Sequence, residues 1–348
     1  MVKEVTMNEQ ATSLAPQGEL FSSPDVEEAR TFFREKPRTM TKKLMSVSEA
    51  VSRFVLDGDY LASGGFGGVR IASAVLHEIV RQRKRNLGIA GHTATHDFQI
   101  LAAGRCFDRC DIAYIVGLEL RGLSPNARRY MESGAVKMTE WSNATLAWRY
   151  KAASMGVPFL PARVVLGTEV LKYSAAKTIE CPFTGTKLLA VPALYPDVGI
   201  IHVHRADIYG NCQIDGITIA DYDVGRSSKR VIITTEHLVH TDEIRKEPLK
   251  TLLPFWLVDA VCHVPYGSYP GNMPYEYFSD EAHLAQWMQA EQDPKAFQEF
   301  LDKYIYGVKD FTEYLELNGG ESRMAELRAL EPLRRNEGMS VPSRGGSL

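Results

Sequence analysis

The chain has 348 residues, of which 45% are hydrophobic and 24% are charged, which is ordinary for a soluble globular protein of one large domain or two. Its formal net charge of −3 argues against a nucleic acid or an anionic membrane as partner. No apolar run is long enough to span a membrane, and the N-terminus lacks the apolar centre of a secretory signal. The odd count of five cysteines predicts reduced thiols and a cytoplasmic protein.

Residues 1–44 are predicted to form an N-terminal extension that is partly disordered, because they are rich in Glu, Ser, Pro and Lys. One short helix is expected there, with Ser23 as its cap and Pro24 in its first turn. The main domain is expected over residues 45–320, beginning with a helix capped by Ser46-Val47-Ser48-Glu49.

Apolar runs and helical patterns then alternate along the main domain. Nearly continuous apolar strands between helices are typical of a parallel sheet that is covered on both faces, so the predicted fold class is α/β with a mostly parallel sheet. Residues 281–318 are predicted to be helical, and residues 321–348 to form a C-terminal tail. The expected strands are Tyr60–Ser63, Leu87–Gly91, Ile112–Val116, Leu188–Val191, Val198–His202 and Arg230–Thr235, and the earlier helices are Ile71–Gln82, Ala127–Ser133 and Ser142–Met155.

The most informative stretch is Asp57–Gly68, a polar turn and a short apolar strand that ends in four glycines around Phe66. A turn without Cβ atoms lets a ligand approach the backbone N–H groups, and the following helix adds its dipole. A dinucleotide fingerprint matches poorly, because Arg70 stands where the third glycine would be. Two interpretations remain: a tight strand-to-helix turn, and a loop that receives an acyl thioester.

Polar residues also follow other predicted strands. His92 and His96 are four residues apart, but they come directly after Leu87–Gly91, so we expect a polar ligand loop rather than a metal site. His202 and His204 alternate along a strand and therefore face one side of it, either as a polar patch or as a proton-transfer pair.

Three further positions carry candidate functional groups. Glu119 follows a strand and can pair with Arg121 as an active-site carboxylate, although a surface salt bridge is the simpler interpretation. Ser142 and Asn143 open a helix, where a cap is the ordinary role, and a cap beside a ligand loop can also bind substrate. The sequence has no serine elbow and no Cys-x-x-Cys, so no nucleophile is self-evident.

Several motifs, taken in order, resemble one enzyme family. Asp57-Gly58…Gly64-Gly65-Phe66 resembles the signature of family I coenzyme A transferases. Further stretches, which extend the resemblance over roughly residues 45–320 and are most similar to glutaconate-type alpha subunits, are Ser154–Pro161, Ala190–His202, Asp207–Asn211, Asp242–Pro248 and Val258–Pro270.

The resemblance implies the CoA-transferase architecture and an alpha subunit that works with a separate beta subunit in an A2B2 heterotetramer. It implies a ping-pong reaction through a glutamyl-CoA thioester on a glutamate of the beta subunit, with CoA as substrate and no permanently bound cofactor or metal. The backbone of Gly64, Gly65, Phe66 and Gly67 would then stabilise the oxyanion. The candidate substrate-binding residues are Arg70, His92, Thr93, Arg121, Ser142 and Asn143, with the arginines suited to a distal carboxylate.

Three alternatives stay open. Glutaconate-type heteromers also include hydrolases that open rings and decarboxylases of CoA thioesters, which lack the partner glutamate or carry a glutamate near the position of Asn143. Asn143 therefore favours CoA transfer. A protein of another class, an NAD-binding oxidoreductase, would bind a nicotinamide at the glycine turn, and a regulatory alpha subunit would only stabilise the beta chain.

Overall fold

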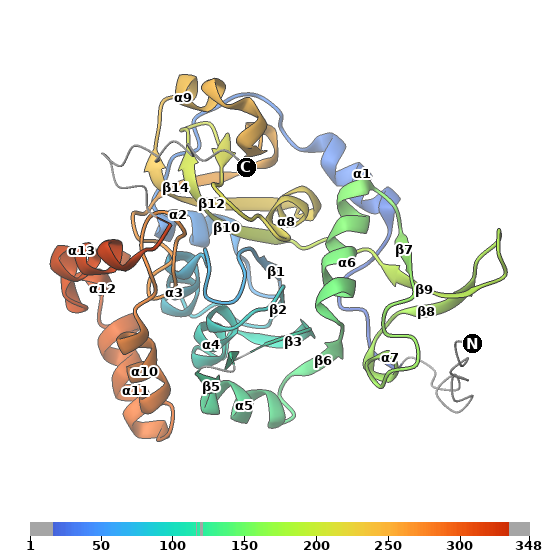
Figure 1. Ribbon diagram of the computed structural model, residues 1–348, viewed down its shortest axis with the longest axis horizontal. Coiled ribbons are helices and arrows are strands. Elements are labelled where there is room, and N and C mark those ends of the chain that lie inside the picture. The colour runs from blue at the N-terminus through green and yellow to red at the C-terminus, as the bar shows by residue number, and fades with distance from the viewer. Residues whose placement is uncertain (1–16, 116, 119–120, 334–348) are drawn as a thin grey trace, which may run out of the picture.

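The computed structural model describes residues 17–333 apart from residues 116, 119 and 120. Its centre is a nine-stranded sheet in which seven strands run parallel (Figure 1). Two short antiparallel strands, β11 (Cys212–Gln213) and β13 (Thr251–Leu253), extend the sheet beside the end of β10. The parallel strands, in spatial order, are β6 (Lys137–Glu140), β3 (Phe107–Ile112), β2 (Leu87–Gly91), β1 (Tyr60–Ser63), β10 (Val198–Ala206), β12 (Arg230–Leu238) and β14 (Ala260–His263).

Successive residues of the central strands point to opposite faces of the sheet. Leu61 and Ile89 belong to one apolar core, whereas Ala62 and Ala90 belong to the other. Helices cover both faces, so the predicted α/β class is confirmed. In the described part of the chain, no helix has the length and apolar character needed to cross a bilayer. The first face carries α2 (Val47–Phe54), α3 (Ser73–Arg81), α4 (His96–Ala103) and α5 (Pro125–Glu132), and the second carries α6 (Asn143–Met155) and α8 (Asp221–Ser227).

The third predicted strand, Ile112–Val116, is misplaced. The strand is β3, Phe107–Ile112, whose charged residues hide it from a search for apolar runs. Asp111 is fully buried there because Arg149 pairs with it and the Trp141 indole donates to it. The partners lie 30 or more residues away in sequence, so a local pattern could not reveal them.

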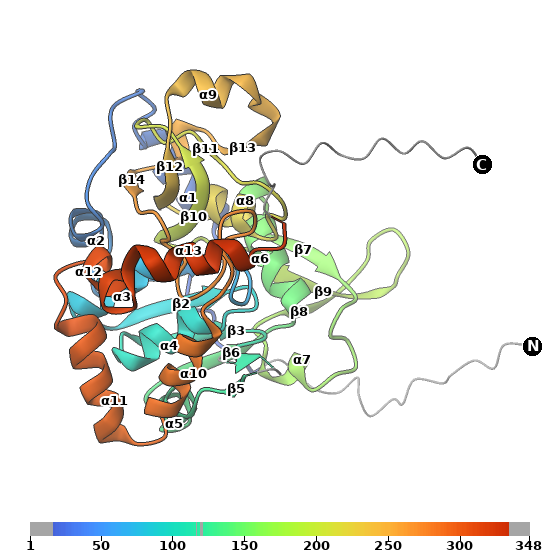
Figure 2. The same cartoon turned by 60° about the vertical axis from the view of Figure 1, so that its left-hand side comes forward.

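The predicted strand Leu188–Val191 lies outside the parallel sheet. It is β9 (Lys187–Pro192), the middle strand of a separate antiparallel sheet between β7 (Phe159–Ala162) and β8 (Lys177–Glu180). The β8–β9 hairpin projects from the body of the molecule (Figures 1 and 2). The remaining short elements are α7 (Val170–Tyr173), α9 (Thr241–Lys246) and the β4–β5 hairpin (Gly117–Leu118 and Gly122–Leu123).

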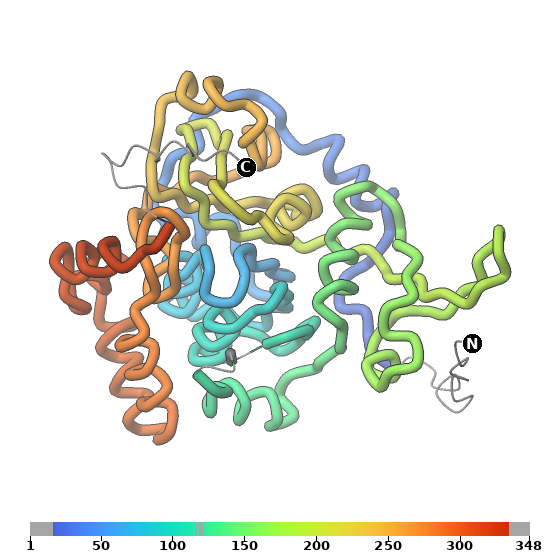
Figure 3. Tube along the Cα trace, in the orientation of Figure 1, coloured from blue at the N-terminus to red at the C-terminus, as the bar shows by residue number. Residues whose placement is uncertain are grey.

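Four helices at the C-terminal end form a layer beside α3 (Figures 2 and 3). The tail predicted from residue 321 begins too early, because α13 buries Met324 and Leu327 and its Arg323 forms an ion pair with Asp280 at 2.8 Å. The last part of the predicted tail lies outside the described residues. The four helices are α10 (Glu281–Ala290), α11 (Pro294–Leu301), α12 (Phe311–Leu317) and α13 (Gly320–Leu330).

The described part of the N-terminal extension, residues 17–44, is bound along its length to the main domain. Near its start, the Thr139 hydroxyl of β6 donates to the Glu19 carbonyl at 2.8 Å. At its end, Val261 of β14 donates to the Lys43 carbonyl and accepts from the Met45 N–H, at 2.9 and 3.0 Å. The extension therefore runs from one edge strand of the central sheet to the other.

A short helix does form in the extension, as predicted. It is α1 (Val26–Glu35), but its cap is Asp25 rather than Ser23, because the Asp25 carboxylate accepts the N–H groups of Glu27 and Glu28. Residues 1–16 lie outside the described part of the chain.

Lys36, just after α1, fixes the extension to the main domain. Its ammonium donates to the carbonyls of Lys229 and Leu257, both at 2.9 Å, and to the Asp259 carboxylate at 2.7 Å. Burial lowers the pKa of Lys36, and Asp259 opposes that shift. The expectation of partial disorder therefore does not apply to this described segment.

Candidate active site

The glycine loop, residues 64–68, leaves β1 at the carboxyl end of the central sheet, the edge where ligands bind in open α/β sheets. Hydrogen bonds within the chain already use the four N–H groups that we expected to face an oxyanion. Among the described residues, the N–H of Gly68 donates to none, so it is the loop donor left for a ligand. The four internal bonds run from Gly64 to the Ile200 carbonyl (2.9 Å), Gly65 to Asp221 Oδ1 (2.8 Å), Phe66 to the Val69 carbonyl (2.9 Å) and Gly67 to the Thr93 carbonyl (2.8 Å).

Arg70 lies beneath the loop and is committed to Asp221. Arg70 Nη2 and Asp221 Oδ2 are 3.0 Å apart, and their side chains are 1% and 0% exposed. Arg70 also donates to the Ile217 carbonyl at 2.6 Å. In this conformation the guanidinium supports the loop and is not presented to a substrate, although we predicted it as a substrate-binding residue.

Gly64 and Gly65 are required by the packing of the loop itself. A Cβ atom on Gly64 would lie 2.6 Å from Asp221 Oδ1, so only glycine lets this carboxylate approach. Gly65 has a φ of +84°, and a Cβ there would lie 2.6 Å from the Val69 carbonyl oxygen.

The segment after β14 holds the loop from its other side. The Asn272 N–H donates to the Gly68 carbonyl, and the Asn272 carbonyl accepts from the Arg70 N–H, both at 2.9 Å. A Cβ on Gly271 would lie 2.3 Å from the Gly68 carbonyl oxygen. The loop is therefore clamped between α8 and this segment, which gives it one fixed shape.

The open face of the loop carries two of the predicted substrate-binding residues. The Phe66 ring is 39% exposed, and its centroid lies 5.7 Å from that of the His92 ring. Burial lowers the pKa of His92, and the charge of Asp221 opposes that shift. Thr93 is buried, with its carbonyl bound to Gly67. His92 and Thr93 thus border the glycine loop, as their position after β2 predicted.

Arg121 reaches the same place from the β4–β5 hairpin. Its Nη1 and Nη2 would lie 3.7 and 3.9 Å from a Cβ atom on Gly68. Its Nε and Nη2 donate to the two carboxylate oxygens of Glu281, at 2.8 and 2.5 Å. Glu119, which we considered as its partner, lies outside the described residues. Glu281 was missed because it is 160 residues away in sequence.

Ser142 and Asn143 do not meet the glycine loop. Ser142 caps α6 and forms a capping box with Thr145, as the ordinary interpretation predicted. These residues follow β6, which is three strands from β1. Since neighbouring strands are about 4.8 Å apart, the cap lies about 14 Å along the sheet from the loop.

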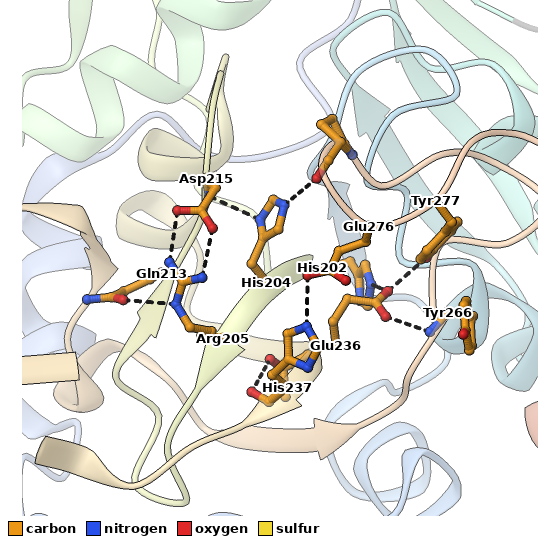
Figure 4. A network of polar contacts seen from close by, with 12 residues as sticks. His202, His204, Arg205, Gln213, Asp215, Glu236, His237, Tyr266, Glu276 and Tyr277 are labelled. Carbon is orange, nitrogen blue, oxygen red and sulfur yellow. Dashed lines mark hydrogen bonds and ion pairs between the residues drawn. The ribbon is translucent and has the colours of Figure 1, made fainter. Parts of the chain in front are cut away.

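His202 belongs to a buried polar network at the ends of β10 and β12 (Figure 4). Its Nε2 lies 2.6 Å from Glu236 Oε1, and its Nδ1 lies 2.8 Å from the Thr234 hydroxyl. Glu236 also accepts from the Tyr277 hydroxyl at 2.8 Å and the Tyr266 N–H at 2.7 Å. This saturated carboxylate holds β12 to the segment after β14, and nothing in the local sequence marked it.

His204 bonds to different groups from those of His202 (Figure 4). Its Nε2 lies 2.8 Å from the Pro274 carbonyl, and its Nδ1 accepts the Asp215 N–H at 3.0 Å. These contacts require a neutral ring with its proton on Nε2, and burial lowers the pKa of His204 accordingly. The two histidines form a polar patch, not a proton-transfer pair.

The loop after β2 places His92 and His96 apart in function. The His96 ring is buried and lies 4.9 Å from the Trp287 ring, whereas His92 faces Phe66. Within the described ranges, no group of three His, Cys, Asp or Glu side chains suits a metal ion.

Asp97, at the start of α4, is a buried carboxyl close to the loop. It is 4% exposed, and burial raises its pKa to about 6, although bonds from the Ser63 hydroxyl and the Phe98 N–H oppose this shift. Its ionisation therefore opposes folding near neutral pH.

We expect Asp221→Asn to destabilise the protein by about 3–5 kcal/mol, because it leaves the buried Arg70 guanidinium without a counter-charge. Urea unfolding of the purified protein measures the loss. Asp223→Asn is the matched control on the same helix, since Asp223 faces the part-exposed Lys151 at 3.5 Å, and it should cost at most about 1 kcal/mol. Equal losses in the two variants would contradict the assigned role of Asp221.

The raised pKa of Asp97 predicts a specific pH dependence of stability. The folded protein binds this proton more tightly than the unfolded chain, so stability is present below about pH 4 and is lost as pH rises to about 6. Asp97→Asn should remove this loss, which amounts to about 3 kcal/mol for a shift of about two pKa units. Unfolding of both proteins between pH 4 and 7 tests it, and parallel pH profiles would refute it.

Comparisons with known proteins agree with the motif resemblance. Residues 44–263 match the family described as Coenzyme A transferase. The alpha chain of the 3-oxoadipate CoA-transferase of Pseudomonas knackmussii is 36% identical over 276 residues, which cover 78% of this chain and 96% of that protein. The alpha chain of the glutaconate CoA-transferase of Acidaminococcus fermentans is 30% identical over 308 residues, which cover 84% and 96%.

Solved structures show the same relationship. The crystal structure of the Acidaminococcus fermentans glutaconate coenzyme A-transferase matches with a TM-score of 0.78 and 29% identity, over 82% of this chain and 95% of that one. A variant of the decarboxylase AibA/AibB matches with a TM-score of 0.68 and 32% identity, over 75% and 98%. The chain therefore belongs to the coenzyme A transferase family, as the glycine-loop motif predicted.

Proposed function

We propose that this chain is the alpha subunit of a cytoplasmic CoA-transferase that moves CoA between an acyl-CoA and a carboxylic acid. A beta subunit, in an A2B2 assembly, provides the nucleophilic glutamate. The names of the two relatives, both alpha chains of a CoA-transferase, support this assignment. Because the family acts through CoA, we set aside the NAD-binding alternative.

The observation that carries the proposal is the state of the carboxylates around the glycine loop. A nucleophilic carboxylate must be free to attack a thioester carbonyl. Asp221 pairs with Arg70, Glu281 pairs with Arg121, and Asp97 is buried at the start of α4. These three are engaged by the fold, which supports a nucleophile supplied by a partner chain.

The proposed reaction has two mirrored halves. The partner glutamate attacks the thioester carbonyl, CoA thiolate leaves, and an acyl-glutamyl anhydride forms. The thiolate then attacks the glutamyl carbonyl of the anhydride, which releases the first carboxylate and leaves glutamyl-CoA. The acceptor carboxylate attacks this thioester, the thiolate leaves again, and its attack on the new acyl carbonyl gives the second acyl-CoA and free glutamate.

The residues of this chain bind and stabilise the acyl group. Each tetrahedral intermediate carries an oxyanion, and we assign the Gly68 N–H as the loop donor, since Gly64, Gly65, Phe66 and Gly67 hold the shape of the loop. Phe66, His92 and Thr93 border the acyl site. Arg121 is suited to a distal carboxylate of the acyl group, because its guanidinium faces Gly68.

Trapping the covalent intermediate tests the proposed function. The purified complex is incubated with acyl-CoA without acceptor, and the mass of each chain is measured. We expect a CoA adduct on the partner chain. Glu119 is the rival nucleophile in this chain, so Glu119→Gln should leave the adduct unchanged. An adduct on this chain that disappears with Glu119→Gln would overturn the split-site assignment.

A second candidate, decarboxylation of a CoA thioester, is favoured by the likeness to AibA/AibB at 32% identity. The same experiment separates it from CoA transfer. A decarboxylase forms no CoA adduct on either chain and releases CO₂ from a carboxylated acyl-CoA. A regulatory alpha chain would leave the adduct on the partner unchanged when the glycine loop is altered.

We expect Gly68→Val to reduce CoA transfer at least 100-fold, because losing an oxyanion donor typically costs about 3–4 kcal/mol and the new side chain fills the space before the loop. Only the Arg121 guanidinium lies within 4 Å of the added Cβ, so the thermal midpoint should change little. Gly65→Ala, in contrast, should lower the thermal midpoint. Unaltered transfer by a folded Gly68→Val variant would exclude a role for this face.

A further inference from the structure

Arg121 uses only part of its guanidinium in the fork with Glu281. Nε and Nη2 are bonded to the carboxylate, and among the described residues Nη1 has no hydrogen-bond partner. Nη1 is also the atom nearest to the Cβ position of Gly68, at 3.7 Å. Two donors, Nη1 and the Gly68 N–H, thus remain at one place on the loop.

Glu281 is itself fixed at both ends of its contact. The Ser279 hydroxyl donates to Glu281 Oε1 at 2.6 Å. Its neighbour Asp280 caps α10 and accepts two bonds from Arg323 of α13, at 3.0 and 2.8 Å. The C-terminal helical layer therefore holds the start of α10, and with it the carboxylate that Arg121 meets.

We propose that Glu281 is a positioning residue, which holds Arg121 against the glycine loop so that Nη1 binds the distal carboxylate of a dicarboxylic acyl-CoA. This inference rests on the proposed function, because it concerns the acyl group carried on CoA. It adds a residue and a substrate class that the loop alone does not define.

The physical reason lies in the freedom of a long side chain. An arginine on a short hairpin loses rotamer entropy when it binds a ligand, and a fork that fixes it beforehand removes most of that cost. The bidentate geometry also sets the plane of the guanidinium, which a single contact would not. The hydrogen bond with Arg121 lowers the pKa of Glu281, so the anchor stays charged.

Binding measurements test this without requiring turnover. Calorimetry on the purified complex compares glutaryl-CoA, which has a distal carboxylate, with butyryl-CoA, which lacks it. We expect Glu281→Gln to weaken glutaryl-CoA binding by about 10-fold, in the range for hydrogen bonds to a charged group, and to leave butyryl-CoA binding unchanged. Glu243→Gln, at an exposed glutamate paired with Lys246 on α9, is the matched control and should change neither.

A double variant separates positioning from a general structural effect. In Arg121→Gln, the additional change Glu281→Gln should have no further effect on glutaryl-CoA binding. Equal weakening for both ligands, additive losses, or a wild-type protein with no preference for glutaryl-CoA would overturn the inference. Transfer of CoA by the same wild-type complex reports separately on the proposed function, which stands or falls by the trapped adduct.

Discussion

One buried carboxylate, that of Asp221, fixes the geometry of the candidate site. It accepts the Gly65 N–H with one oxygen and the Arg70 guanidinium with the other, so the glycine loop and the arginine that follows it share a single anchor. Gly64 has no Cβ atom to obstruct this contact. A buried charge pair is costly to desolvate and so is weak evidence of a stabilising device. Here its clearest effect is to give the loop one shape, which a site built from backbone donors needs.

The surroundings of the loop come from parts of the chain that are far apart in sequence. Asp221 lies on α8, Asn272 lies after β14, and Arg121 comes from the hairpin after β3. The C-terminal helices extend this connection, because Arg323 holds Asp280 next to Glu281. The site is therefore assembled at one edge of the sheet by long-range contacts around a short local motif.

The sequence predicted what is local. The strand Tyr60–Ser63 and the loop after it were placed correctly, because an apolar run that ends in glycines has few other solutions. β3 was missed because Asp111 is buried by partners that only the fold brings together. Arg70 was assigned to substrate for the same reason, since its partner lies 151 residues later. Ligand-facing and structural arginines look alike until their counter-charges are located.

The N-terminal extension has a consequence for the outer strands of the central sheet. A strand with one unpaired edge offers a row of N–H and C=O groups to any extended segment of another molecule. Lys43 and Met45 occupy this edge of β14 through Val261, and Glu19 reaches the side of β6 at Thr139. The extension thus closes the sheet at positions where a chain without it would offer templates for intermolecular strand addition, and it contributes to keeping the molecules separate in a concentrated solution.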